Sequence, residues 1–136
     1  MTHSSAWRTT LIMLLAIGAV SAVAGAVGLL TDTLQMEESL LEGSPFSSFT
    51  IPGLILGVIV GGSQFVALAA LLRHSFHAIV AAGAAGCIMA GWIIGEVLLV
   101  GSDPGIMRNL QVLYFLIGLL ETILAAILLR RTPQQV

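Results

Sequence analysis

Four apolar stretches constrain this chain more than any other feature. They cover about residues 9–30, 51–72, 78–100 and 110–129. An α-helix rises about 1.5 Å per residue, so each stretch can cross the roughly 30 Å hydrocarbon core of a bilayer. A spanning helix also satisfies its own backbone hydrogen bonds where no water is present. The sequence therefore predicts an all-α integral membrane protein, a single domain of residues 1–136 folded as a four-helix bundle.

The composition agrees with a lipid environment. Of the 136 residues, 57% are hydrophobic and 9% are charged, and the mean hydropathy is +1.04. A soluble domain would carry about a quarter charged residues. The net charge is −2 and no basic run is present, so nucleic-acid binding has no electrostatic support. We therefore expect the lipid bilayer, and no nucleic acid, as a partner.

The basic residues predict an antiparallel, up-down bundle and its orientation. Four arginines and two histidines fall on one side: Arg8, Arg73, His74, His77, Arg130 and Arg131. Arg108 falls on the other side, with the acidic outer loop of residues 31–50. The positive-inside rule then places both termini in the cytoplasm. A cleaved signal peptide would also begin with a positive charge and an apolar run, but the length of the first run favours a retained helix.

Small residues recur at intervals of four in the second and third stretches. The two sets are Gly53, Gly57 and Gly61, and Gly83, Cys87, Gly91 and Gly95. This spacing puts each set on one helix face, where a neighbouring backbone can approach closely. We expect these faces to pack the two helices together, or to pack one of them against another protomer.

Two carboxylic acids interrupt the apolar stretches. Glu96 lies about 6 Å below the outer surface, whereas Glu121 lies near the middle of its helix, about 15 Å from either end. A charged carboxylate at mid-membrane costs at least ~2.5–3.5 kcal/mol, so Glu121 should face the bundle interior. Ser63 and Gln64 lie at a similar depth, and we expect them to be its partners.

Gln111 and Tyr114 share the helix face of Glu121, and we expect Tyr114 to hydrogen-bond Glu96. The sequence thus predicts an internal polar seam of six residues: Ser63, Gln64, Glu96, Gln111, Tyr114 and Glu121. Such a seam is either a proton, ion or small-ligand site, or a set of hydrogen bonds that only joins helices. The histidines near Arg73 lack a third ligand, so we expect no metal site.

Three local runs carry a resemblance to a known group of proteins. The runs are GSPF at 43–46 with TIPG at 50–53, GWI at 91–93, and LQ at 110–111 with YF at 114–115. They resemble small four-span bacterial inner-membrane proteins of unassigned function, and the general plan resembles the DoxX-like group. The resemblance implies four spans in a bacterial plasma membrane, and it carries over no catalytic or binding residue.

The first of three functions is the one that we expect, and the other two are alternatives. The glycine faces favour a non-enzymatic accessory or assembly protein in a homo-oligomer or a larger membrane complex. Glu121 with Gln64 favours a small-molecule or proton-coupled carrier. Only the DoxX-like plan supports a membrane enzyme, because the sequence contains no nucleophile–base arrangement, phosphate loop or dinucleotide fingerprint. We accordingly expect no cofactor.

Overall fold

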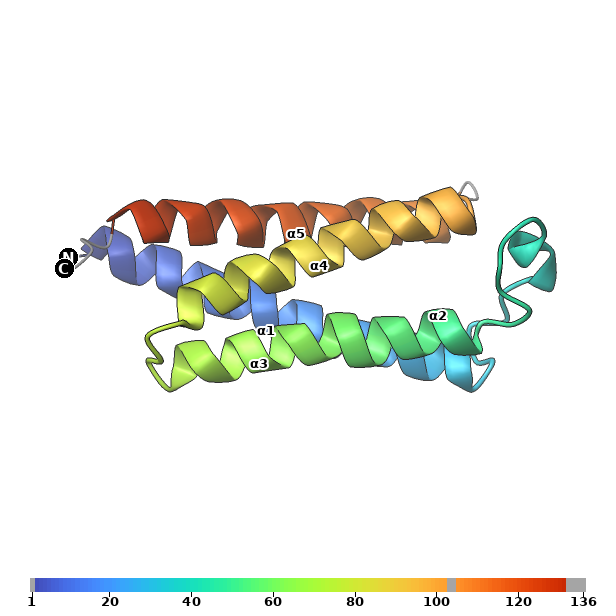
Figure 1. The fold of residues 1–136 in the computed structure, drawn as a ribbon, viewed down its shortest axis with the longest axis horizontal. Helices are drawn as coiled ribbons and strands as arrows, with labels where there is room; N and C mark the ends of the chain where they lie inside the picture. The colour runs from blue at the N-terminus through green and yellow to red at the C-terminus, as the bar shows by residue number, and fades with distance from the viewer. Residues whose placement is uncertain (1, 103–104, 132–136) are drawn as a thin grey trace.

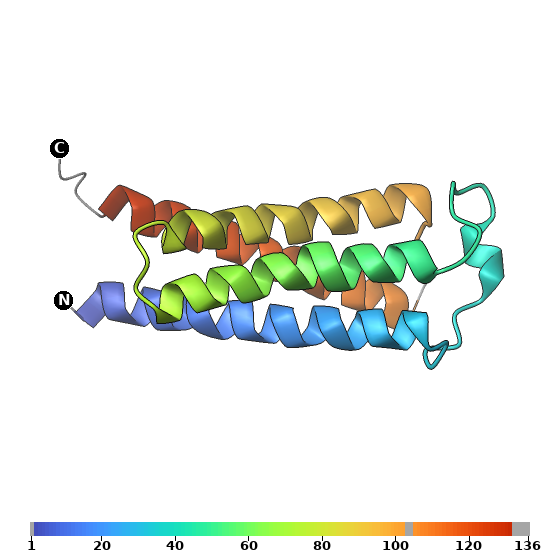
Figure 2. The same ribbon diagram turned by 60° about the horizontal axis from the view of Figure 1, so that its bottom comes forward.

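The computed structural model describes residues 2–102 and 105–131, and it forms a bundle of long helices (Figures 1 and 2). Its elements are α1 (Thr2–Leu30), the 3₁₀ helix η1 (Glu38–Leu41), α2 (Thr50–Leu54), the π-helical segment η2 (Ile55–Gly61), α3 (Gly62–Leu72), α4 (Ala78–Leu99) and α5 (Ile106–Arg131). α2, η2 and α3 follow one another without a break, and we call this rod the second span. The prediction of an all-α four-helix bundle is confirmed.

All four rods are long and apolar enough to cross a membrane. α1 and α5 extend beyond the predicted stretches by several residues, because an established helix propagates through polar positions at little cost. The outward surface is apolar as well: Val20, Val66 and Leu98 are 65%, 66% and 79% exposed. A continuous apolar surface of this kind is compatible with a multi-pass membrane protein.

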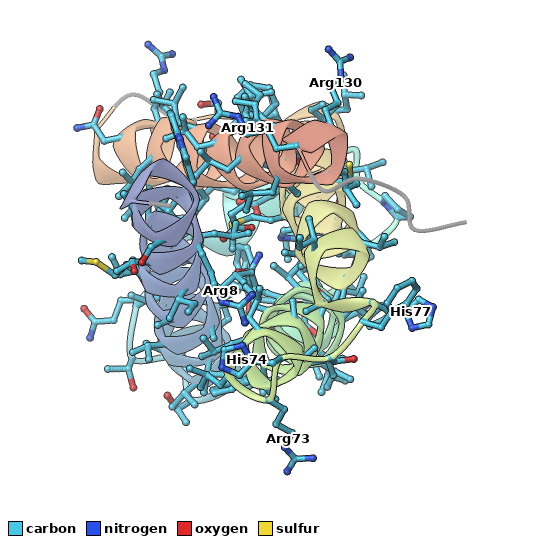
Figure 3. All side chains as sticks on the ribbon, turned by 90° about the vertical axis from the view of Figure 1, so that its left-hand side faces the viewer. Arg8, Arg73, His74, His77, Arg130 and Arg131 are labelled. Atoms are coloured by element: carbon cyan, nitrogen blue, oxygen red, sulfur yellow. The ribbon has the colours of Figure 1, made fainter. Side chains whose placement is uncertain are left out.

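The rods form a closed ring, seen end-on in Figure 3. α1 packs against the second span and α5, and α4 packs against the same two neighbours. Consecutive rods run antiparallel, so both described ends of the chain lie at one end of the bundle (Figure 1). We call this the terminal end. The loop with η1 lies at the opposite, loop end.

The basic residues that the sequence assigns to one side do gather at the terminal end (Figure 3). Arg8 points toward the second span, where its guanidinium donates to the Leu71 carbonyl oxygen and lies 3.0 Å from His74 Nδ1. The Arg131 guanidinium carbon lies 5.8 Å from the centre of the Trp7 ring, within reach of a cation–π interaction. These contacts fasten α1 to the second span and to α5.

The closest helix contact joins α4 and α5 at two glycines outside the predicted sets. A Cβ on Gly86 would lie 2.6 Å from the Gly118 carbonyl oxygen, and a Cβ on Gly118 would lie 2.7 Å from the Gly86 oxygen. Only glycine permits so close an approach of two backbones. Gly86 was not part of the predicted set because it directly precedes Cys87 in the sequence. One residue corresponds to about 100° around the helix, so Gly86 lies on a different face.

The first predicted glycine set lies against α1, and its expected contact with α4 is wrong. Gly53, Gly57 and Gly61 all have α1 side chains as near neighbours, and a Cβ on Gly57 would lie 2.8 Å from the Ala26 Cβ. The second span therefore uses this face to bring α1 close.

The second predicted set is divided between the interior and the surface. A Cβ on Gly83 would lie 3.2 Å from the Ala125 Cβ of α5. A Cβ on Gly91 or Gly95 would meet open space. Cys87 is exposed at the edge of the contact with α5, where its Sγ lies 3.6 Å from Thr122 Oγ1. Most of this set thus faces away from the bundle.

The substitution Gly86→Ala should destabilise the bundle by about 1–3 kcal/mol, because the added methyl group overpacks the contact with Gly118. Gly91→Ala, on the same helix, is the matched control. It should leave stability unchanged or raise it by up to ~1 kcal/mol, since alanine favours a helix and nothing opposes its Cβ. Reversible unfolding in mixed detergent micelles measures both. Equal stability of the two variants would contradict the assigned packing.

Candidate functional site

Glu121 lies on the inner face of α5, and none of its surface is exposed (0%). The residues on this face repeat at intervals of three and four, and all are buried or half-buried: Gln111, Tyr114, Gly118, Glu121 and Ala125. This helical period turns the carboxyl group toward the other rods. The structure thus places Glu121 in the interior, where the sequence predicted it.

Gln64 of α3 is the hydrogen-bond partner of Glu121. Its Nε2 donates to Glu121 Oε2 at 2.7 Å and lies 3.4 Å from the Ala85 carbonyl oxygen of α4. Gln64 is also 0% exposed. α1 closes the remaining side, since a Cβ on Gly18 would lie 2.6 Å from Gln64 Oε1. All four rods therefore meet around Gln64 and Glu121, which we call the central pair.

Two oxygen atoms of the central pair have no donor among the described residues, namely Gln64 Oε1 and Glu121 Oε1. Leaving a buried acceptor without a partner costs about 1–3 kcal/mol. A proton on Glu121 would convert one acceptor into a donor, and a small cation or a water molecule would supply the missing interaction. The central pair therefore has the chemistry to bind a proton or a small polar species.

Apolar layers separate the central pair from both ends of the bundle. Toward the loop end, Ala22, Val60, Met89 and Ile117 pack together and form what we call the loop-side layer. Toward the terminal end lies a larger cluster, the terminal-side cluster, which includes Leu11, Leu15, Ala67, Leu71, Ala78, Ala82, Leu124 and Leu128. The site is therefore occluded from water on both sides.

A second amide–carboxyl pair lies nearer the loop end. Gln111 Nε2 donates to Glu96 Oε1 at 3.1 Å and to the Gly101 carbonyl oxygen at 3.2 Å. Trp92 and Glu96 contribute to the lining of a cavity of about 30 Å³, which is large enough to hold a water molecule. Gln111 Oε1 and Trp92 Nε1 have no partner among the described residues. Unlike the central pair, this pair lies beside space that water can fill.

The structure divides the predicted seam into these two pairs. Ten residues (121 − 111) separate Gln111 from Glu121, a rise of about 15 Å along α5, and the loop-side layer lies between them. Ser63 does not reach Glu121 as predicted. Its hydroxyl donates to the Val60 carbonyl oxygen at 2.8 Å, a bond within its own helix that serine commonly makes.

The predicted bond between Glu96 and Tyr114 is replaced by the bond from Gln111, which lies one turn nearer the loop end. Tyr114 instead packs beside the loop-side layer. Sequence reasoning missed the part that Gly18 plays in covering Gln64, because the glycines of the first stretch do not indicate which neighbour each one meets. Trp92 gives a weak signal as an aromatic residue one turn before Glu96.

Within the described ranges, no group of three or more His, Cys, Asp or Glu side chains could hold a metal ion. Comparison of the chain with protein-family models, with curated proteins and with solved structures gives no match. The site's own geometry therefore carries the functional argument.

Replacing Gln64 by leucine should destabilise the bundle by about 1–3 kcal/mol, because it leaves the Glu121 carboxyl group without its donor. The double variant Gln64→Leu/Glu121→Leu should recover most of that loss, since both polar groups are then removed from the apolar interior. Equilibrium unfolding in detergent measures each variant.

Ser63→Ala is the matched control for Gln64→Leu, because the Ser63 hydroxyl bonds only its own helix. It should change the free energy of unfolding by less than about 0.5 kcal/mol. If Gln64→Leu were as stable as Ser63→Ala, the central pair would have no part in holding the helices together.

Proposed function

We propose that this multi-pass membrane protein is a proton-coupled carrier in which Glu121 gains and loses the proton. The observation that carries the proposal is a carboxyl group with no exposed surface, held by one hydrogen bond from Gln64 and left with one unpartnered oxygen among the described residues. Ionisable side chains at such depth are costly in a membrane, and they mark proton and ion paths. Among the alternatives left open for Glu121, these observations best support the proton relay.

The packing around the central pair suits a carrier in its occluded state. α4 and α5 form one closely packed helix pair, joined at Gly86 and Gly118. α1 and the second span form another, joined along the glycines that face α1. Carriers commonly expose a midplane site to each side in turn by rocking one such unit against the other. The loop-side layer and the terminal-side cluster would then act as the two gates.

The hydrogen bond of the central pair crosses the boundary between these two helix pairs, because Gln64 belongs to one and Glu121 to the other. An ionised Glu121 would accept a charge-assisted bond, about twice as strong as the bond to a neutral acid. Protonation of Glu121 would exchange this bond for one to a neutral acid and would turn the second carboxyl oxygen into a donor, so it would change the link between the two units. This couples proton binding to the relative motion that transport requires.

The proposal includes a bacterial plasma membrane with both termini in the cytoplasm. The basic side chains at the terminal end support this orientation through the positive-inside rule. The resemblance of the GSPF, TIPG and GWI runs to bacterial inner-membrane proteins supports the choice of membrane.

Infrared difference spectra of the protein in liposomes should contain a signal from a carboxylic acid in an apolar site that changes with pH. Glu121→Gln should remove that signal while the fold is retained, because the new amide keeps an oxygen acceptor for Gln64. Glu42→Gln, which changes an exposed loop carboxylate, is the matched control and should leave the signal intact. A native signal that does not respond to pH, or one that persists in Glu121→Gln, would overturn the proposal.

A second candidate function rests on the outward face of α4. Cys87 is exposed there, and Gly91 and Gly95 border open space. Small residues at intervals of four let another transmembrane helix approach closely. On this observation the chain would act as an assembly protein that associates with a second copy of itself through α4.

Cys87 is the single cysteine of the chain, so it reports directly on that association. Oxidation of native membranes should give a disulfide-linked dimer, because packing at this face brings the two Cys87 Cα atoms within about 7 Å. Gly91→Leu should reduce dimer formation about tenfold, since a leucine side chain at the contact would separate the helices by more than a disulfide can bridge. Gly62→Leu, which also meets open space but lies on the second span, should not. Absence of a dimer in the native chain would exclude self-association through this face.

A further inference from the structure

A groove lies between the outer faces of α4 and α5 near the loop end, with a volume of about 310 Å³. Its walls are almost wholly apolar and include Ile93, Val97, Val112 and Leu116. Val97 and Val112 are 39% and 53% exposed, so the groove opens outward rather than into the bundle. In a membrane, such a groove faces lipid.

The polar residues of the groove lie toward one end of it. Ser102 belongs to the connection between α4 and α5, and Arg108 lies in the first turn of α5. Gln111, the amide that bonds Glu96, lines the groove one turn further along α5. From Arg108 to Leu116 the lining extends over eight residues (116 − 108), or about 12 Å along the helix axis. Half of the hydrocarbon core is about 15 Å deep. The groove therefore begins at headgroup level and covers most of one leaflet.

Charge at the loop end favours one kind of occupant. The other four of the five basic residues lie at the terminal end (Figure 3), so Arg108 is the one basic residue of this sequence on the loop side. The loop of residues 31–50 on the same side is acidic and repels anions. A guanidinium group binds a phosphate through two parallel hydrogen bonds. An anionic headgroup at the loop end thus has a single favourable location, directly above an apolar groove.

We propose that this groove binds one anionic phospholipid, with its phosphate at Arg108 and an acyl chain along the apolar walls. The site lies outside the central pair, and the proposal is independent of proton transport. An uncharged lipid would fill the same walls but would lack the interaction with Arg108. Preference for an anionic headgroup therefore separates this site from the ordinary layer of surrounding lipid.

Native mass spectrometry of the full chain in a nonionic detergent tests the proposal. Dioleoylphosphatidylglycerol and dioleoylphosphatidylcholine, which carry the same chains, are added in equal amounts. The native chain should bind the anionic lipid about fivefold better, which corresponds to one arginine near a charged headgroup. Arg108→Gln should bind both lipids equally, and Arg108→Lys should keep part of the preference. Val97→Phe should reduce binding of both lipids, because the larger ring occupies the groove.

Arg130→Gln is the matched control, since it removes an exposed arginine at the opposite end. It should keep the native preference. The proposal is overturned if the native chain shows no preference, if the preference survives Arg108→Gln, or if Arg130→Gln abolishes it equally, which would indicate general charge attraction. Unchanged thermal unfolding of Arg108→Gln establishes that a loss of binding is local.

Discussion

The approach of α4 and α5 at Gly86 and Gly118 is the contact on which the rest of the bundle depends. In lipid the hydrophobic effect does not drive helices together, so close packing and hydrogen bonds must do so. The same crossing places Glu121 against α4, because a Cβ on Gly86 would lie 2.9 Å from the Glu121 Cβ. Held there, the carboxyl group lies within reach of Gln64, and the second span can close the ring.

The energetics of the central pair argue against a purely structural role. An interhelical hydrogen bond in a membrane contributes on average ~0.6 kcal/mol, whereas a charged side chain at this depth costs ~2.5–3.5 kcal/mol. Two unpartnered oxygens add to the cost. Replacing both groups by apolar residues of similar size would therefore cost little. This balance supports the proposed role of Glu121 in proton binding.

The sequence predicts the level of a residue along the bundle well and its rotation around the helix poorly. Counting residues from the helix ends predicted that Gln64 and Glu121 lie at the same level, because the rise per residue is constant and neighbouring rods are antiparallel. The hydrogen bond between them confirms this. Ser63 was assigned wrongly because its hydroxyl bonds its own helix. Tyr114 was assigned wrongly because Gln111, one helical turn away, makes the bond to Glu96. The contact at Gly86 was not predicted, because an apolar stretch has no polar face that would indicate how the helix is rotated. Neither the loop-side layer nor the groove beside Arg108 has a signature in the sequence.

The π-helical segment Ile55–Gly61 sets the direction in which Gln64 points, because it directly precedes α3 in the second span. A π-turn contains one residue more than an α-turn, so it changes the rotational phase of everything that follows it. Gln64 comes three residues after its end. Losing or gaining one residue in this segment would rotate the amide about 100° around the axis, from the interior toward lipid. The meeting of the two polar groups is thus a matter of helical register, set by the turns that precede Gln64 in the second span.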